Sequence, residues 1–235
     1  MTVAIVTGAS RGLGEALATG LADRGWSLVL DGRDADALER AARRVGETAP
    51  GARIAAVAGD IADPEHRRQL IGAAGGLGGV DLVVNNASVL GATPLPALAA
   101  YPLDELRRAY EVNALAPLAL IQASLPLLRQ STEPRILNVT SDASVEAYEG
   151  WGGYGSSKAA LDHLSAVLAV EEPAVRTWVV DPGDMRTRMH QEAFPGEDIS
   201  DRPLPATVVP VLLHLIEGDQ PSGRYRASDL ASAGA

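Results

Sequence analysis

The chain opens, after two residues, with Val3-Ala4-Ile5-Val6-Thr7-Gly8-Ala9-Ser10-Arg11-Gly12-Leu13-Gly14. The apolar first part of this stretch predicts a buried β-strand, and its glycines predict a tight turn into a helix. Glycine lets the backbone approach a ligand closely, and the free N–H groups at a helix start attract a pyrophosphate. The spacing differs from the G-x-G-x-x-G fingerprint, so a purely structural turn is the alternative. The position between a strand and a helix favours dinucleotide binding, by Gly8, Ser10, Arg11, Gly12, Leu13 and Gly14.

Short apolar runs alternate with longer helical patterns along the rest of the chain. The predicted strands are Val3–Val6, Ser27–Leu30, Arg53–Ala58, Asp81–Val84, Arg135–Val139, Val175–Val180 and Arg224–Arg226. The predicted helices are Leu13–Arg24, Asp36–Val45, Pro64–Ala73, Leu103–Leu128, Tyr154–Val170 and Ala206–Glu217. This alternation predicts an α/β fold, a doubly wound open sheet of about seven parallel strands with right-handed crossovers and helices on both faces.

Two segments depart from the regular alternation. The helical pattern of residues 103–128 is unusually long, and we expect either two helices or one helix kinked at Pro117. Residues 184–205 are irregular and rich in proline, glycine and charge. A loop of that length inside a compact domain is usually a functional lid or disordered, and we expect a substrate lid.

The composition excludes several classes of protein. The formal net charge of −10 argues against nucleic acid or an anionic membrane as the main partner. No apolar run is expected to be long enough to span a membrane, and the start of the chain shows no targeting signal. The chain has no cysteine, which fits the cytoplasm. We expect no metal site, because the four histidines are scattered and are expected at the surface or its boundary: His66, His163, His190 and His214.

The second predicted strand ends in Asp31-Gly32-Arg33, where a dinucleotide-binding protein selects its cofactor. A carboxylate binds the adenosine ribose diol of NAD(H), whereas a guanidinium binds the 2′-phosphate of NADP(H). Both types of side chain are present, so the local pattern is ambiguous. Arg11 and Arg33 together favour NADP(H), and the alternative is that both arginines are solvated while Asp31 holds the ribose.

Other polar and glycine-containing turns follow the later strands. Asp60, before Ile61, suits either the adenine amine or the cap of the helix that begins near Pro64. Asn86 and Ala87 follow the fourth strand, and Pro182 and Gly183 follow the sixth. Turns are the default explanation for such residues, but this is also the sheet edge where cofactors bind. Thr187 could reach the nicotinamide amide.

Lys158 is the only lysine of the chain, and it lies four residues after Tyr154. Four residues make about one helical turn, so the ammonium and the phenol share a helix face. The ordinary explanation is a solvated surface lysine. An ammonium beside a phenol favours the phenolate, which would lower the pKa of Tyr154 and suit it to acid–base catalysis.

These motifs together resemble the short-chain dehydrogenase/reductase family over nearly the whole chain, from Val3 to about Leu230. The resemblance rests on Thr7-Gly8-x-x-x-Gly12-x-Gly14, Asn85-Asn86-Ala87, Asn113, Ser141, Tyr154-x-x-x-Lys158 and Pro182-Gly183. The chain departs from the family pattern at Ser88, where glycine is usual, and after Ser141, where Asp142-Ala143-Ser144 lacks a common glycine. Both departures border the substrate cavity, so the resemblance leaves the substrate open.

The resemblance implies a single Rossmann-like NADP(H)-binding domain over residues 1–235. It implies a catalytic tetrad of Asn113, Ser141, Tyr154 and Lys158, and a carbonyl/alcohol substrate. Lys158 and Tyr154 would also contact the cofactor, with Gly32 and Arg33 at the positions that select NADP(H). The complete set of predicted cofactor contacts is Gly8, Ser10, Arg11, Gly12, Leu13, Gly14, Arg33, Asp60, Ile61, Asn86, Ala87, Tyr154, Lys158, Pro182, Gly183, Met185 and Thr187.

Three further expectations concern assembly, substrate and alternatives. The resemblance suggests a homodimer or homotetramer. The candidate apolar walls of the substrate cavity are Tyr148, Trp151, Met185, Met189 and Phe194. A catalytically silent NADP(H)-binding sensor or scaffold is the alternative function, although such a protein would be expected to have a broken tetrad.

Overall fold

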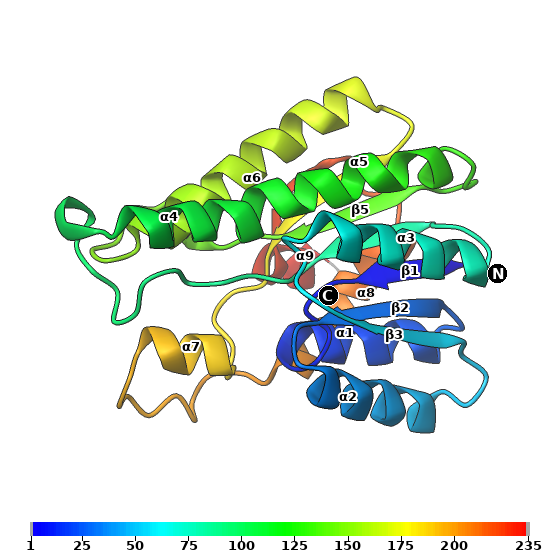
Figure 1. Ribbon diagram of the computed structural model, residues 1–235, viewed down its shortest axis with the longest axis horizontal. Coiled ribbons are helices and arrows are strands. Elements are labelled where there is room, and N and C mark those ends of the chain that lie inside the picture. The colour runs from blue at the N-terminus through cyan, green and yellow to red at the C-terminus, as the bar shows by residue number, and fades with distance from the viewer. Residues whose placement is uncertain (1, 234–235) are drawn as a thin grey trace.

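Seven parallel strands form the centre of the computed structural model, which describes residues 2–233. Their order in the sheet is β3-β2-β1-β4-β5-β6-β7 (Figure 1). The strands are β1 (Val3–Val6), β2 (Ser27–Gly32), β3 (Ile54–Ala58), β4 (Leu82–Asn85), β5 (Arg135–Val139), β6 (Arg176–Asp181) and β7 (Gly223–Arg226). All seven predicted strands are present, with ends shifted by no more than two residues, and the predicted α/β class is confirmed.

Successive side chains of each central strand enter two different hydrophobic cores. In β1, Ala4 and Val6 pack into one core while Val3 and Ile5 pack into the other. This alternation follows from the two-residue period of a strand that is covered on both faces. The first core is closed by α1 (Gly12–Asp23), α2 (Ala35–Thr48) and α8 (Val209–Glu217). The second is closed mainly by α3 (Pro64–Leu77), α5 (Ala116–Leu128) and α6 (Gly152–Glu171) (Figure 1).

The long helical stretch of residues 103–128 is divided by a π-helical turn. It consists of α4 (Leu103–Tyr110), the π turn Glu111–Leu115, and α5. The irregularity therefore lies before Pro117, which sits in the first turn of α5 where its missing N–H costs nothing. By length and composition this stretch could cross a membrane, with a mean hydropathy of 1.3, so the expectation that no apolar run is long enough was wrong. Half of that window, 50%, is buried inside the protein, as in a core helix.

The irregular segment of residues 184–205 contains a short helix that the sequence analysis did not predict. This helix, α7 (Arg188–Ala193), begins at Thr187, whose side chain accepts a hydrogen bond from the backbone N–H of His190. Helix α7 stands away from the main body beside the carboxyl ends of the strands (Figure 1). The last helix, α9 (Ala227–Ala233), directly follows β7 and was also not predicted.

Candidate active site

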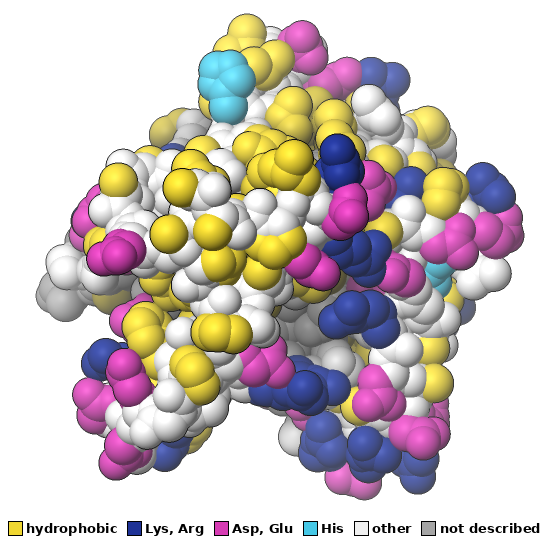
Figure 2. All heavy atoms as spheres, turned by 60° about the vertical axis from the view of Figure 1, so that its left-hand side comes forward, with side chains coloured by type: hydrophobic (Ala, Val, Ile, Leu, Met, Phe, Trp, Pro, Cys, Tyr) yellow, Lys and Arg dark blue, Asp and Glu magenta, His cyan; other side chains and the backbone are white. Residues whose placement is uncertain are grey.

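A crevice of about 770 Å³ lies at the carboxyl ends of the strands. Figure 2 looks onto this side of the molecule and shows a hollow flanked by basic side chains. Five arginines line the crevice although the chain as a whole is acidic: Arg11, Arg33, Arg108, Arg186 and Arg188. The crevice is also lined by every predicted cofactor contact except Gly14, and by Ser141 from the predicted tetrad. Residues that are far apart in sequence thus meet at the carboxyl ends of the strands.

The glycine-rich turn is held to the end of β4 by Thr7 and Asn86. The Thr7 hydroxyl accepts hydrogen bonds from the backbone N–H groups of Asn86 and Ala87, both at 3.0 Å. The side-chain amide of Asn86 donates to the carbonyl oxygens of Thr7 at 2.8 Å and Gly8 at 3.2 Å. A Cβ atom at Gly14 would lie 2.4 Å from the Gly8 carbonyl oxygen, so only glycine fits there. Gly14 therefore contributes to the shape of the turn without lining the crevice. Asn86 does line the crevice, and its side-chain amide fixes the turn by hydrogen bonds.

Asp31 is buried beneath the same turn, and the protein itself uses both of its carboxylate oxygens. One oxygen accepts the backbone N–H of Gly8 at 3.1 Å, and the other lies 2.6 Å from Nε2 of His66. Asp31 and His66 are only 2% and 3% exposed. The expectation that all four histidines lie at the surface or its boundary was wrong for His66, which packs against Gly59 where a Cβ would lie 2.3 Å from its ring nitrogen Nδ1. With both oxygens engaged, Asp31 has a structural role in this arrangement.

Arg33 and Asp60 lie on the wall of the crevice beyond Asp31. Arg33 is exposed, and among residues 2–233 it has no hydrogen-bond or ion-pair partner. Asp60 accepts a hydrogen bond from the backbone N–H of Ala62 at 2.9 Å and forms an ion pair with Arg108. Partial burial favours the neutral carboxyl, but these hydrogen bonds outweigh it and lower the pKa of Asp60. Asp63, rather than Asp60, caps α3, so the capping alternative for Asp60 was wrong.

Tyr154 and Lys158 both line the crevice from the first turns of α6. The Lys158 ammonium lies 5.7 Å from the centre of the Tyr154 ring and donates a 2.9 Å hydrogen bond to the Val139 carbonyl at the end of β5. A Cβ atom at Gly155 would lie 2.4 Å from the Ala143 carbonyl oxygen, so this glycine lets α6 approach the turn after β5. The sequence motif is therefore buried at the crevice, and the solvated-lysine explanation was wrong.

Burial sets the protonation of the pair in opposite directions. It lowers the pKa of Lys158 to about 8, against a smaller upward effect of Asp162. Burial raises the pKa of the Tyr154 phenol, and the negative charges of Asp181, Asp142 and Asp162 add to this, while the Ser88 hydroxyl opposes it. The predicted net lowering of the Tyr154 pKa is thus reversed, because desolvation of the phenolate is the largest effect on this group. At neutral pH the phenol holds its proton.

Asn113 lies in the π turn beneath the crevice and is fully buried. Its amide oxygen accepts hydrogen bonds from the Ser88 hydroxyl at 3.0 Å and the Val89 N–H at 2.9 Å. Its amide nitrogen donates to the Val89 carbonyl at 2.8 Å and the Ser157 hydroxyl at 2.9 Å. These four bonds use the full capacity of a primary amide. Asn113 thus ties α6 to the segment after β4.

Ser141 begins the turn after β5, and its hydroxyl is held by the next residue. The hydroxyl donates to Asp142 Oδ1 at 2.8 Å and accepts the backbone N–H of Ala143 at 3.2 Å. Because a hydroxyl has one proton, Ser141 must release Asp142 before it can donate to a substrate carbonyl. Accepting a hydrogen bond from a substrate alcohol requires no such change.

The turn after β6 and the start of α7 complete the crevice. Gly183 has a φ of +74°, which favours glycine, and its N–H donates to Asp181 Oδ1 at 3.0 Å. The Thr187 hydroxyl caps α7 as an acceptor, so its own proton is still available to a ligand.

The apolar wall between α6 and α7 contains most of the predicted candidates. Trp151, Met189 and Phe194 pack with Tyr154 in a small cluster, and the rings of Trp151 and Phe194 are 5.9 Å apart. Met185 lines the crevice but packs against the main core. Tyr148 does not line it, and its hydroxyl instead contacts Asp142 and Glu146. The prediction for Tyr148 was therefore wrong.

The residues of the crevice fit a dinucleotide phosphate. The backbone of the glycine turn lines the crevice at Gly8 and Gly12, and both residues have a positive φ, +65° and +62°, that favours glycine. The first turn of α1 opens onto it, which directs unpaired N–H groups and the positive end of the helix dipole at an anion. The guanidinium groups of Arg11 and Arg33 add positive charge to the wall of the crevice.

Comparison with known proteins identifies the family. A family model described as short chain dehydrogenase matches residues 2–198. The chain is 34% identical over 201 residues to a sepiapterin reductase of Meriones unguiculatus, covering 81% of this chain and 77% of the relative. It also matches the structure of an alcohol dehydrogenase from the archaeon Thermococcus sibiricus, which is complexed with 5-hydroxy-NADP. That match has a TM-score of 0.86 and 30% identity, and it covers 96% of this chain and 95% of that chain. A short chain dehydrogenase from Shigella flexneri gives a TM-score of 0.88 and 28% identity, covering 97% and 91%. The chain belongs to the short-chain dehydrogenase/reductase family of oxidoreductases.

Three residues that line the crevice or support its walls were not found from the sequence: Arg108, His66 and Arg224. Arg108 lies in a predicted helix with nothing in its local sequence to mark it as a site residue, and its partner Asp60 is 48 residues away. His66 could have been suspected from Gly59, because a glycine before a turn often marks a close packing partner. Arg224, which contacts the Ser141 turn, gave no sequence signal.

Proposed function

We propose that this protein transfers a hydride reversibly between NADP(H) and a carbonyl/alcohol substrate. The observation that carries the proposal is the meeting of Tyr154, Lys158 and Ser141 at one wall of the crevice, beside the glycine turn. When bound, the dinucleotide supplies or accepts the hydride. The protein contributes binding, orientation and a proton.

In this proposal Tyr154 donates its proton to the substrate oxygen as that oxygen gains negative charge. Lys158, still charged below about pH 8, stabilises the phenolate that remains and would hold the ribose of the cofactor. Ser141 hydrogen-bonds the same oxygen, where a donor helps most as charge develops. Because burial raises the pKa of the Tyr154 phenol, the phenol is available at neutral pH as the proton donor for carbonyl reduction.

Replacement of Tyr154 tests this function. Tyr154→Phe removes one oxygen and keeps the ring that packs against Trp151. We expect turnover of an aldehyde and ketone panel to fall by about 10²–10⁴-fold, the usual contribution of a general acid. NADPH binding, measured by fluorescence, should be retained. The matched control is Tyr225→Phe, whose hydroxyl contacts only the Pro221 carbonyl among the described residues. Turnover of the Tyr154 variant at the level of this control would reject the role.

We propose NADP(H) rather than NAD(H) as the cofactor. Asp31 is held by Gly8 and His66, which leaves Arg33 as the available recognition group at the end of β2. The complex of a relative with 5-hydroxy-NADP supports the same choice. Arg33→Ala should weaken NADPH at least tenfold and leave NADH unchanged, whereas Arg40→Ala, on the exposed side of α2, should change neither. An unchanged preference in the Arg33 variant would reject the assignment.

We propose that residues 184–205 act as a lid over the substrate. Helix α7 supplies Met189 to the apolar wall, and Asp184 to Arg188 continue the lining of the crevice toward the cofactor contacts. Limited proteolysis with and without NADPH tests this, because a closing lid should become resistant. Nothing in the crevice favours the sensor or scaffold alternative.

We also propose a homodimer or homotetramer in the cytoplasm. Large apolar side chains are exposed on α4, on the π turn that follows it and on α6: Leu103, Leu115, Val167 and Val170. Val170 is 80% exposed, and such side chains commonly pair across subunits. Light scattering of the purified protein would measure the number of subunits, and fractionation of a tagged copy would test the location.

A further inference from the structure

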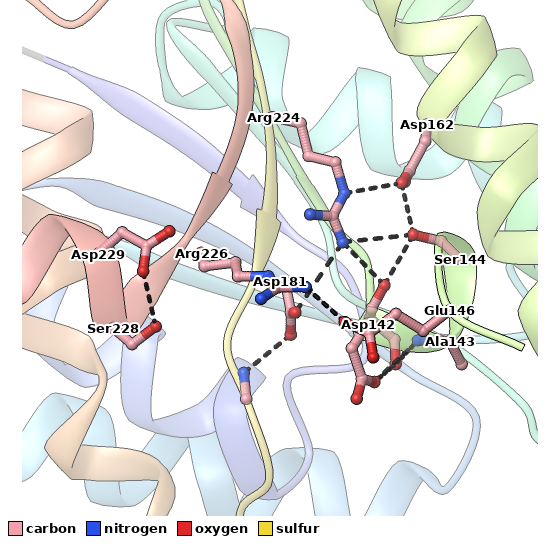
Figure 3. A network of polar contacts seen from close by, with 12 residues as sticks. Asp142, Ala143, Ser144, Glu146, Asp162, Asp181, Arg224, Arg226, Ser228 and Asp229 are labelled. Atoms are coloured by element: carbon pink, nitrogen blue, oxygen red, sulfur yellow. Dashed lines mark hydrogen bonds and ion pairs between the residues drawn. The ribbon is translucent and has the colours of Figure 1, made fainter. Parts of the chain in front are cut away.

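Arg224 of β7 contacts three segments: the turn after β5, helix α6 and the end of β6 (Figure 3). Its Nη2 donates to the Ser141 carbonyl oxygen at 3.0 Å, and its Nε donates to Asp162 Oδ2 at 3.1 Å. Nη2 also lies 3.4 Å from the Ser144 hydroxyl and 3.9 Å from Asp181 Oδ2. A planar guanidinium has enough donors, in a fixed fork, to contact this many acceptors at once.

The partners of Arg224 lie on the same helix, turn and strand end as the proposed catalytic and cofactor-binding residues. Asp162 is on α6, one helical turn after Lys158. Ser144 closes the turn that Ser141 begins, and its hydroxyl lies 2.7 Å from the Ser141 carbonyl and 2.6 Å from Asp162 Oδ2. Asp181 is the last residue of β6, directly before Pro182 and Gly183.

Arg224 also balances negative charge around the phenol. The titratable groups that affect Tyr154 are the carboxylates Asp142, Asp162 and Asp181, and the ammonium of Lys158 faces its ring. Asp162 is 15% exposed at its side chain, and its Oδ1 is buried with no hydrogen-bond partner among the described residues. Its charge therefore depends on Arg224 for compensation, since unpaired buried charges are costly. Arg226, two residues on, pairs with the outer Glu146, and its charge acts on Asp181 less than that of Arg224.

We infer that Arg224 is a positioning residue for catalysis, which fixes the Ser141 turn against α6 and offsets the carboxylates that face Tyr154. The inference rests on the proposed function, because it assigns Arg224 a role in the proton transfer by Tyr154. It concerns neither the cofactor phosphates nor the apolar wall of the substrate site. Loss of Arg224 should therefore affect the chemical step more than binding.

The test compares Arg224→Gln with Arg224→Lys, and uses Arg226→Gln as the matched control for loss of one positive charge on β7. Steady-state rates are measured in both directions, over a range of pH, with a carbonyl/alcohol pair that the wild type turns over. For Arg224→Gln we expect kcat to fall roughly 10–100-fold, with KM for NADPH within about twofold of wild type. The pH at half-maximal rate of alcohol oxidation should rise by about one unit, because uncompensated carboxylates disfavour the phenolate.

Two further variants separate charge from shape. Arg224→Lys keeps the charge but loses the fork, so it should restore the pH midpoint and leave kcat reduced. The double variant Arg224→Gln/Asp162→Asn removes both charges of the pair and should return the midpoint toward wild type. Arg226→Gln should leave kcat and the midpoint within twofold and a few tenths of a unit of wild type.

The outcomes are distinguishable. Reduced thermal stability with unchanged kcat and an unmoved pH midpoint would show a merely structural arginine and overturn the inference. The inference would also be overturned if Arg224→Gln and Arg226→Gln had the same kcat and the same pH dependence. If instead the wild type has no carbonyl or alcohol turnover, or Tyr154→Phe is as active as wild type, the proposed function fails, and with it the assignment of Arg224 to proton transfer.

Discussion

Replacement of Asp31 by alanine distinguishes a structural carboxylate from a cofactor ligand. Asp31→Ala removes the hydrogen-bond partner of the part-buried Gly8 N–H and of the buried Nε2 of His66. Each orphaned group costs about 1–3 kcal/mol, so together they lower the free energy of unfolding by about 4 kcal/mol. For a chain of this size that corresponds to a fall in Tm of roughly 8–16 °C. The protein should stay folded at room temperature, since domains typically have about 5–15 kcal/mol of stability.

The assay pairs thermal unfolding with cofactor titration. Because Asp31 holds the Gly8 turn that both cofactors share, Asp31→Ala should weaken NADH and NADPH by a similar factor. Arg33→Ala, two residues away and exposed, should leave the Tm within about 1 °C of wild type and weaken NADPH alone. A double-mutant cycle with His66→Ala should show coupling above about 0.5 kcal/mol, as expected for residues in contact.

One result would refute this reasoning. If Asp31→Ala unfolds at the wild-type temperature and loses affinity for NADH selectively, the carboxylate acts on the ribose and not on the turn. The NADP(H) assignment would then lose its main structural support.

Three further predictions follow from the site. The rate of carbonyl reduction should be constant near neutral pH and decline as the pH rises through about 8, because Lys158 is charged below its lowered pKa and neutral above it. A rate that stays constant to well above that pH would contradict the role of the ammonium beside Tyr154. Gly14→Ala should lower the Tm and abolish NADPH-dependent fluorescence changes, since its Cβ would lie 2.4 Å from the Gly8 carbonyl oxygen; normal NADPH binding would show that the turn can shift. Trp151→Ala removes the ring that packs 5.9 Å from Phe194, so it should change KM for bulky carbonyl substrates while leaving the Kd for NADPH unaltered, as substrate titration and NADPH fluorescence would show.

The strands and most helices were predictable because their patterns are local. The apolar run of β1 and the glycines after it fix a strand, a turn and a helix without help from distant residues. Helix α7 was not predicted because it has only six residues, and its cap, Thr187, had been read only as a cofactor contact. A short helix in a polar segment carries too few apolar positions to show a period.

The candidate site was predictable where spacing along one element decides it, and not where the tertiary structure decides it. Tyr154 and Lys158 share one helix, so their separation in sequence indicates their proximity. Whether Asp31 or Arg33 recognises the cofactor depends on the burial of Asp31 beneath the Gly8 turn, and the local sequence does not indicate that burial. Arg224 contacts the Ser141 carbonyl across 83 residues, and only the sheet order brings them together.

The π turn that holds Asn113 has a consequence for the opposite end of the crevice. A π turn carries one surplus residue relative to a regular α-helix. Deleting a residue from Glu111–Leu115 would let the helix run on regularly, but it would rotate all of α4 by about 100° around its own axis. Arg108 would then swing away from Asp60, and the adenosine side of the crevice would lose that ion pair. The same surplus residue that places Asn113 against Val89 and Ser157 therefore fixes the rotation of α4 about its own axis.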